Sequence, residues 1–109
     1  MATLEERFKK IVEINGKDFQ FQIAVEECAE FIQAVQKYKR GRDSLDHVLE
    51  EMADVLVTFA CLKEAIKHDS KLYTYVDDFI MQIMDKKTKW AETYKGTSKD
   101  PVTWQSTGA

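Results

Sequence analysis

Apolar residues recur every three or four positions over four stretches of this 109-residue chain. This is the period of one face of an α-helix. The breaks between the stretches hold residues that begin or end helices: Thr3 as an N-cap, Asn15-Gly16 and Gly41 as terminators, and Asp43 or Ser44 and then Ser70 as later caps. The pattern therefore predicts an all-α fold with one short helix and three long ones, over residues 3–14, 18–39, 44–68 and 70–94.

The loop between the second and third predicted helices, Gly41-Arg42-Asp43, is short, so these two helices are expected to be antiparallel neighbours. The third helix is apolar on so many sides that it should be buried on more than one of them. We therefore expect an antiparallel bundle of four helices, completed by assembly into a homodimer or homotetramer. Residues 1–96 would form a single domain, and 97–109, which hold the only proline and Trp104, a polar arm.

Two acidic pairs interrupt the apolar pattern. Glu27 lies in the apolar seam of the second helix and Glu30 follows three residues later; Glu51 and Asp54 repeat this spacing on the third helix. Residues three apart lie on one face of a helix. No lysine or arginine stands three or four positions from any of these four acids, so ordinary helical ion pairs do not account for them.

Four unpaired carboxylates brought together by antiparallel helices would repel one another unless their charge is matched. A hard divalent cation matches it with oxygen ligands, which makes Mg²⁺ the first candidate and Mn²⁺ an alternative. Two such ions could bridge phosphate oxygens and lower the pKa of a bound water. Two solvated acidic helix faces would give the same spacing, and this interpretation stays open.

The doubled glutamate Glu26-Glu27, followed by Glu30 and then, about twenty residues later, by Glu51 and Asp54, resembles the signature of MazG-like nucleoside triphosphate pyrophosphohydrolases. These enzymes belong to the all-α NTP pyrophosphatases, and the resemblance covers about residues 20–65. It implies magnesium-dependent hydrolysis of a nucleoside or deoxynucleoside triphosphate at the α-phosphate. The products would be a nucleoside monophosphate and pyrophosphate, in the control of nucleotide pools.

The resemblance also suggests roles for residues around the four acids. Glu26 and Glu50 each precede a principal ligand, and either could be a general base or a supporting ligand. Lys86 and Lys89 occupy positions where the family often has a basic Lys-x-x-Arg pattern for the triphosphate, with lysine here in place of arginine. Gln20, two turns before Glu27 on the same face, is the candidate for holding the base.

His47, one turn before Glu51, could reach the site, although a lone histidine at a helix start more often has a structural role. Carboxylate bundles that hold di-iron centres use Glu-x-x-His, which this chain lacks. An oxygen-only site suits Mg²⁺ or Mn²⁺ better than redox iron. The alternative function is a non-catalytic helical assembly, or a nucleotide- or metal-binding module with a vestigial site.

The net charge of −3 becomes +1 when the four acids are set aside, so the acidity is concentrated in the candidate site. No basic stripe suggests binding of polymeric nucleic acid. Cys28 and Cys61 lie within apolar runs without metal-ligand spacing and are expected to be core residues. No apolar run is long enough to cross a membrane, so we expect no membrane partner, and without a signal peptide we expect a cytoplasmic protein.

Overall fold

The computed structural model describes residues 1–68 and 75–94, and these residues form four α-helices and no strand. The helices are α1 (Leu4–Asn15), α2 (Lys17–Lys39), α3 (Leu45–His68) and α4 (Val76–Tyr94). The predicted all-α fold is confirmed, and the ends of the first three helices agree with the sequence pattern to within one residue. The predicted start of the fourth helix at Ser70, the arm over 97–109 and Trp104 lie outside the described residues.

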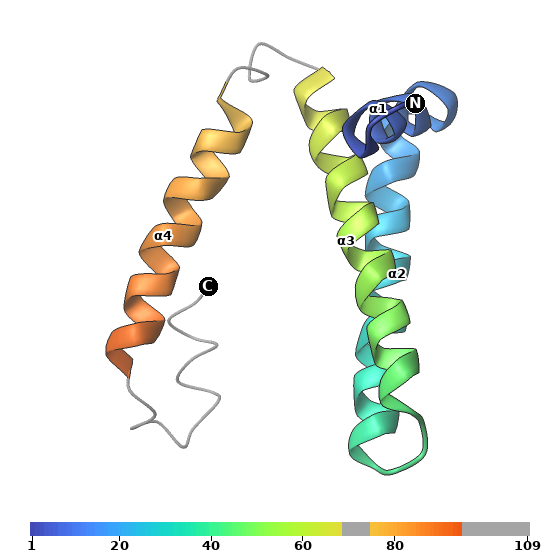
Figure 1. The fold of residues 1–109 in the computed structure, drawn as a ribbon, viewed down its shortest axis with the longest axis vertical. Helices are drawn as coiled ribbons and strands as arrows, with labels where there is room; N and C mark the ends of the chain where they lie inside the picture. The colour runs from blue at the N-terminus through green and yellow to red at the C-terminus, as the bar shows by residue number, and fades with distance from the viewer. Residues whose placement is uncertain (69–74, 95–109) are drawn as a thin grey trace. The chain divides into compact units, whose positions relative to one another are not determined.

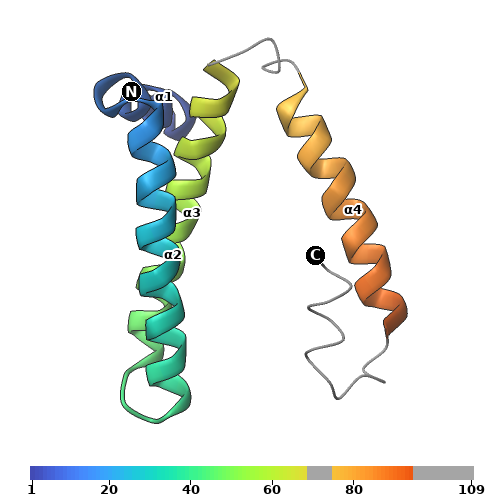
Figure 2. The same ribbon diagram turned by 180° about the vertical axis from the view of Figure 1, so that it is seen from behind.

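Contacts divide the chain into two compact units, residues 1–74 and 75–109. In the first unit, α2 and α3 lie side by side in antiparallel directions, as predicted from the short connection, and α1 packs against the end of this pair (Figures 1 and 2). The described part of the second unit is α4, a single helix. The acid-bearing helices α2 and α3 therefore belong to the same unit.

A capping box fixes the start of α1, and Gly16 marks the boundary between α1 and α2. The Thr3 hydroxyl accepts a hydrogen bond from the Glu6 backbone N–H at 3.1 Å, while the Glu6 carboxylate accepts one from the Thr3 backbone N–H at 3.0 Å. This reciprocal pair is the predicted capping box, and it lowers the pKa of Glu6 because the Thr3 backbone N–H stabilises its ionised form. Gly16 separates the two helices with φ +85°, a conformation that residues with a Cβ rarely adopt.

The turn between α2 and α3 is also set by local hydrogen bonds. Gly41, at φ +73°, donates from its backbone N–H to the Tyr38 carbonyl, and Arg42 donates to the Lys37 carbonyl, both at 2.9 Å. This pairing is a Schellman motif, which satisfies the last carbonyls of α2. Ser44 then caps α3 by accepting a hydrogen bond from the His47 backbone N–H at 3.2 Å.

The core of the first unit is small and lies where α1 meets α3. Val12, Cys61 and Ala65 are buried together, with Phe8 and Ile11 packed against them. Cys61 is therefore the core residue that the sequence predicts, and burial raises the pKa of its thiol. Cys28 is only half-buried.

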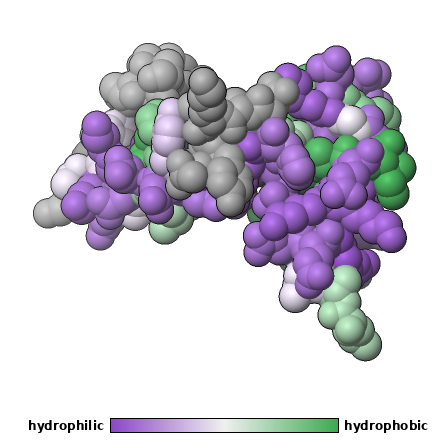
Figure 3. Space-filling view, turned by 90° about the horizontal axis from the view of Figure 1, so that it is seen from above, coloured by the Kyte–Doolittle hydropathy of each residue, from purple (hydrophilic) through white to green (hydrophobic). Residues whose placement is uncertain are grey.

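Many large apolar side chains of α3 are exposed in the single chain. Five of them, at alternating spacings of four and three residues, are between 41% and 63% exposed: Leu45, Leu49, Met52, Leu56 and Phe59. Seen from above, the surface of the first unit, on the right in Figure 3, is mostly hydrophilic and has a hydrophobic patch at its outer edge. The predicted assembly with a second subunit, which would cover such residues, stays a prediction. Within the described residues, no helix is both long and apolar enough to span a membrane.

Candidate metal centre

The antiparallel pairing of α2 and α3 brings three carboxylates together. Glu27 of α2 and Glu51 and Asp54 of α3 each offer an oxygen, and these oxygens lie within 4.8 Å of one another. Glu51 and Asp54 share a face because they are three residues apart on one helix. The site is therefore built from two helices joined by a short, well-capped turn.

Two of these carboxylates carry buried oxygens that have no hydrogen-bond partner, Oε2 of Glu27 and Oε2 of Glu51. A buried anionic oxygen without a partner is costly. Burial raises the pKa of Glu27, and the negative charges of Glu30, Asp54 and Glu51 raise it further. The cluster offers only carboxylate oxygens, and two of these have no hydrogen-bond partner. Hard oxygen ligands of this kind suit Mg²⁺ or Mn²⁺.

Asp54 differs from the other two acids because its side chain is exposed. The sequence places it in an apolar run, and the run is present, but its neighbours Leu56 and Val57 are themselves 63% and 46% exposed in the single chain. The cost of desolvation in this chain therefore falls on Glu27 rather than on Asp54.

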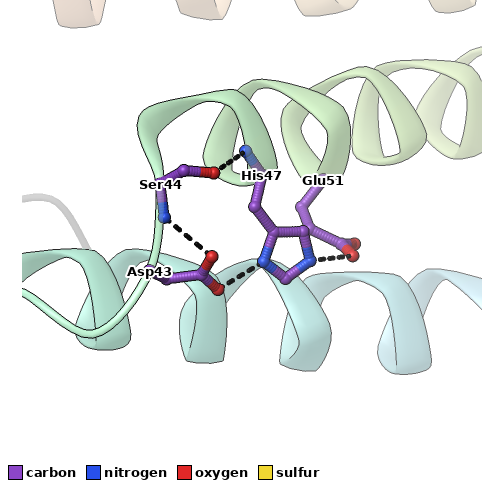
Figure 4. A network of polar contacts seen from close by, with 4 residues as sticks. All are labelled: Asp43, Ser44, His47 and Glu51. Atoms are coloured by element: carbon purple, nitrogen blue, oxygen red, sulfur yellow. Dashed lines mark hydrogen bonds and ion pairs between the residues drawn. The ribbon is translucent and has the colours of Figure 1, made fainter.

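A polar network leads from the start of α3 into the carboxylate cluster (Figure 4). The ring of His47 lies between two acids, with Nδ1 2.5 Å from Oδ2 of Asp43 and Nε2 3.2 Å from Oε1 of Glu51. The other oxygen of Asp43, Oδ1, accepts a hydrogen bond from the Ser44 backbone N–H at 2.7 Å. One metal-ligand candidate, Glu51, is thus held by a histidine that is itself held from the other side.

Electrostatics within this network favour a charged histidine and an ionised aspartate. The hydrogen bond to Asp43 raises the pKa of His47, and Glu51 adds to the effect. The same hydrogen bond from His47, together with that from the Ser44 backbone, lowers the pKa of Asp43. These directions are what an ion pair produces.

Comparison with protein families finds that residues 18–93 match the model of the MazG nucleotide pyrophosphohydrolase domain. The chain belongs to the MazG family. The match contains α2 from its second residue, α3 whole, α4 up to its penultimate residue, and all four acids of the predicted site. No curated protein and no solved structure matched the chain in the corresponding searches.

The MazG family is one of nucleotide pyrophosphohydrolases, and its members typically use a divalent metal. The carboxylate cluster therefore has the composition that the family's chemistry requires. The remaining acids of the predicted site, Glu26, Glu30 and Glu50, are all exposed and lie outside the group of three. Glu30 still acts on the cluster, because its charge helps to raise the pKa of Glu27. Its role as a ligand, and those of Glu26 and Glu50 in catalysis, stay predictions.

Gln20 is one of the most buried polar residues in the described part of the MazG domain, at 2% exposure, and its Nε2 has no hydrogen-bond partner. It lies on α2 two turns before Glu27, as the sequence indicates. An amide donor left unsatisfied in a buried position is unusual in a folded protein. The described residues therefore leave this donor unsatisfied.

Lys86 and Lys89, the predicted phosphate-binding residues, lie on α4 in the second unit, and both are exposed. Lys89 makes an ion pair of 3.1 Å with Asp85, one turn away on the same helix. An exposed pair at this spacing contributes little to stability. Lys89 can therefore leave Asp85 for another partner with little loss of stability.

Two acids that the sequence analysis did not connect with the site acquire roles in the structure. Asp43 is predicted only as a helix cap, yet it also binds His47. The spacing of Asp43, His47 and Glu51, four residues each, was the available signal: His47 and Glu51 share one face of α3, and Asp43 stands one further turn back, just before the helix begins. Glu64 is buried at 5% exposure and is paired with Lys67 at 3.6 Å. It lies ten residues beyond Asp54, about 15 Å along α3, outside the cluster.

Proposed function

We propose that this MazG domain hydrolyses nucleoside or deoxynucleoside triphosphates to a nucleoside monophosphate and pyrophosphate, with Mg²⁺ as the cofactor. The observation that carries the proposal is the group of Glu27, Glu51 and Asp54, two of whose buried oxygens lack partners. Membership of a nucleotide pyrophosphohydrolase family supports the reaction class. Glu30 completes the ligand set in this proposal, as the exposed acid whose charge already acts on Glu27.

When bound, Mg²⁺ supplies charge neutralisation for the triphosphate oxygens and acidifies a coordinated water. Glu27, Glu51 and Asp54 would hold it. Glu26 or Glu50 would accept the proton of the attacking water, and their exposure leaves them accessible to it. Of Glu26 and Glu50, the general base would be the one whose carboxylate lies within hydrogen-bond distance of the attacking water.

The candidates for substrate recognition are Gln20 on α2 and Lys86 and Lys89 on α4. Gln20 would donate its free Nε2–H to an acceptor on the base or sugar, which would satisfy a buried donor that has no partner in the chain. Lys86 and Lys89 would neutralise phosphate charge as point charges, since lysine lacks the planar fork of arginine. The cytoplasm, where nucleotide pools are kept, is the proposed location.

The test is pyrophosphate release from a panel of NTPs and dNTPs, with Mg²⁺ and with EDTA, in the parent, Asp54→Asn and Asp46→Asn. The Asp54→Asn change keeps the side-chain volume and removes one ligand charge, so we expect it to weaken Mg²⁺ binding and to lower turnover by roughly 100-fold or more. Asp46, an exposed acid in the first turn of the same helix, is the matched control and should retain the parent rate.

Identification of the products distinguishes this reaction from other phosphoanhydride hydrolysis, because release of phosphate and a nucleoside diphosphate would mean attack at the γ-phosphate. A folded Asp54→Asn protein that binds Mg²⁺ and releases pyrophosphate as the parent does would overturn the mechanism. A parent that binds Mg²⁺ but cleaves no nucleotide in the panel would favour the alternative of a binding module with a vestigial site.

A further inference from the structure

The side chain of His47 lies between two carboxylates, and helix capping does not require it there. Its two ring nitrogens contact carboxylates on opposite sides, Asp43 at 2.5 Å and Glu51 at 3.2 Å. The three side chains are 38% (His47), 23% (Asp43) and 15% (Glu51) exposed, so the contact with Glu51 is the more sheltered of the two. Shielding from water strengthens a charge-assisted hydrogen bond.

The two oxygens of Glu51 are in different situations. Oε1 accepts the contact from His47, whereas Oε2 is buried and has no partner. Glu51 also belongs to the group of carboxylates whose oxygens converge within 4.8 Å. The histidine therefore satisfies one oxygen of the carboxylate and leaves the other unsatisfied.

The ring is fixed from its far side as well. Asp43 binds Nδ1 through Oδ2, and its own carboxylate is held by the Ser44 backbone N–H through Oδ1 at 2.7 Å (Figure 4). This series of contacts removes rotational freedom from the imidazole before any ligand arrives. A glutamate side chain has several rotatable bonds, so a carboxylate held in advance loses less conformational entropy when it binds a cation.

The capping of α3 does not require the imidazole. The bond from position 47 to the Ser44 hydroxyl is donated by the backbone N–H, which is present whatever the side chain. The side-chain contacts and the helix cap can therefore be separated by mutation.

We propose that His47 is a positioning residue of the metal site, whose Nε2 holds Oε1 of Glu51 so that Oε2 is presented as a ligand atom. The inference rests on the proposed function, because it takes Glu51 as a magnesium ligand. Residues that orient metal ligands in this way typically change metal affinity or activity by about 10- to 100-fold when they are removed.

The experiment compares His47→Gln, His47→Asn and His47→Ala. The amide nitrogen of glutamine approximates Nε2 of histidine and can still donate to Glu51, whereas that of asparagine approximates Nδ1 and can donate only towards Asp43. Titration calorimetry with MgCl₂ gives the metal affinity, and pyrophosphate release gives kcat and KM. His68→Gln, at the exposed end of the same helix, is the matched control.

We expect His47→Ala and His47→Asn to weaken Mg²⁺ binding by about 10- to 100-fold, and His47→Gln to retain affinity within about threefold of the parent. At saturating Mg²⁺ the kcat of all three should recover towards that of the parent, since the defect is in ligand placement. Thermal denaturation in EDTA shows that each variant is folded.

Rescue by asparagine rather than glutamine would show that the contact with Asp43 is what matters, and would overturn the proposal. Equal Mg²⁺ affinity in the parent and His47→Ala would overturn it too. These results differ from failure of the proposed function, in which the parent itself would bind no Mg²⁺ or release no pyrophosphate.

Discussion

Glu27 is the residue whose environment conflicts most with its charge. Its Oε2 is buried without a partner, and burial together with the charges of Glu30, Asp54 and Glu51 raises its pKa. A raised carboxyl pKa means that the folded protein binds more protons than the unfolded one between the two pKa values. In the metal-free protein, the contribution of Glu27 to stability is therefore fully present below the ordinary glutamate value of 4.5 and is lost as the pH rises through its pKa in the folded state.

Glu27→Gln should remove this loss. We expect the metal-free variant to exceed the parent in free energy of unfolding at neutral pH by roughly 1 kcal/mol, the size of an ordinary single-residue effect. The difference should vanish below pH 4.5, where the parent carboxyl is also neutral. Urea denaturation in EDTA over this pH range measures it, with Glu13→Gln, an exposed acid of α1, as the control.

Magnesium should reverse the order of stability, because a bound ion stabilises only the protein that retains its ligands. The prediction is contradicted if the difference in free energy of unfolding between the parent and Glu27→Gln stays the same across the pH range, with and without Mg²⁺. That result would show that the carboxylates around Glu27 do not repel one another.

At the scale of elements, the turn between α2 and α3 keeps the two acid-bearing helices antiparallel and adjacent. Gly41 holds φ +73° at its centre, and open space surrounds the position where a Cβ would stand. A substitution there acts through backbone strain alone, because no neighbouring atom would clash.

Gly41→Ala should therefore destabilise the first unit by about 1 kcal/mol, the cost of placing a residue with a Cβ in the left-handed region. Gly41→Asn should cost less, because asparagine tolerates that region. Thermal denaturation followed by circular dichroism compares the two. A smaller loss for alanine than for asparagine would mean that the Schellman turn is not retained in solution.

At the scale of the whole molecule, the exposed apolar residues of α3 are the feature that the first unit by itself leaves unexplained. Leu45, Leu49, Met52, Leu56 and Phe59 alternate at four and three residues, the spacing of a seam between two packed helices. Contiguous apolar surface of this kind is uncommon on a monomer and marks an interaction site. Assembly of identical chains is the proposed explanation, in line with the expectation from the sequence.

Leu56→Lys places a charge in the middle of this seam. We expect sedimentation to show the parent at a multiple of the 12.7 kDa chain mass, and the variant at 12.7 kDa with unchanged helix content. Gln36→Lys, which adds the same charge at an exposed polar position of α2, should leave the assembly as it is. A parent that sediments as a single chain at micromolar concentration would contradict the prediction.

The features that the sequence determined by itself are those that act within a few residues. Thr3 with Glu6, Gly41 with its two hydrogen bonds, and the cap at Ser44 specify helix ends through neighbouring backbone groups. Apolar periodicity specifies which stretches are helical, and three-residue spacing puts Glu51 and Asp54 on one face. None of these depends on how the helices pack.

Tertiary structure decided what happens between α2 and α3. It brought Glu27, Glu51 and Asp54 together while leaving Glu30 exposed outside the group, and it concentrated desolvation on Glu27 rather than on Asp54. These outcomes depend on the rotation of each helix about its own axis and on the side-chain rotamers at their contact, which the spacing of residues in one helix does not specify. The contacts of His47 with Asp43 and Glu51 are local by contrast, because the three residues stand four apart along the chain; what the packing of α2 on α3 adds is the approach of Glu27 to Glu51.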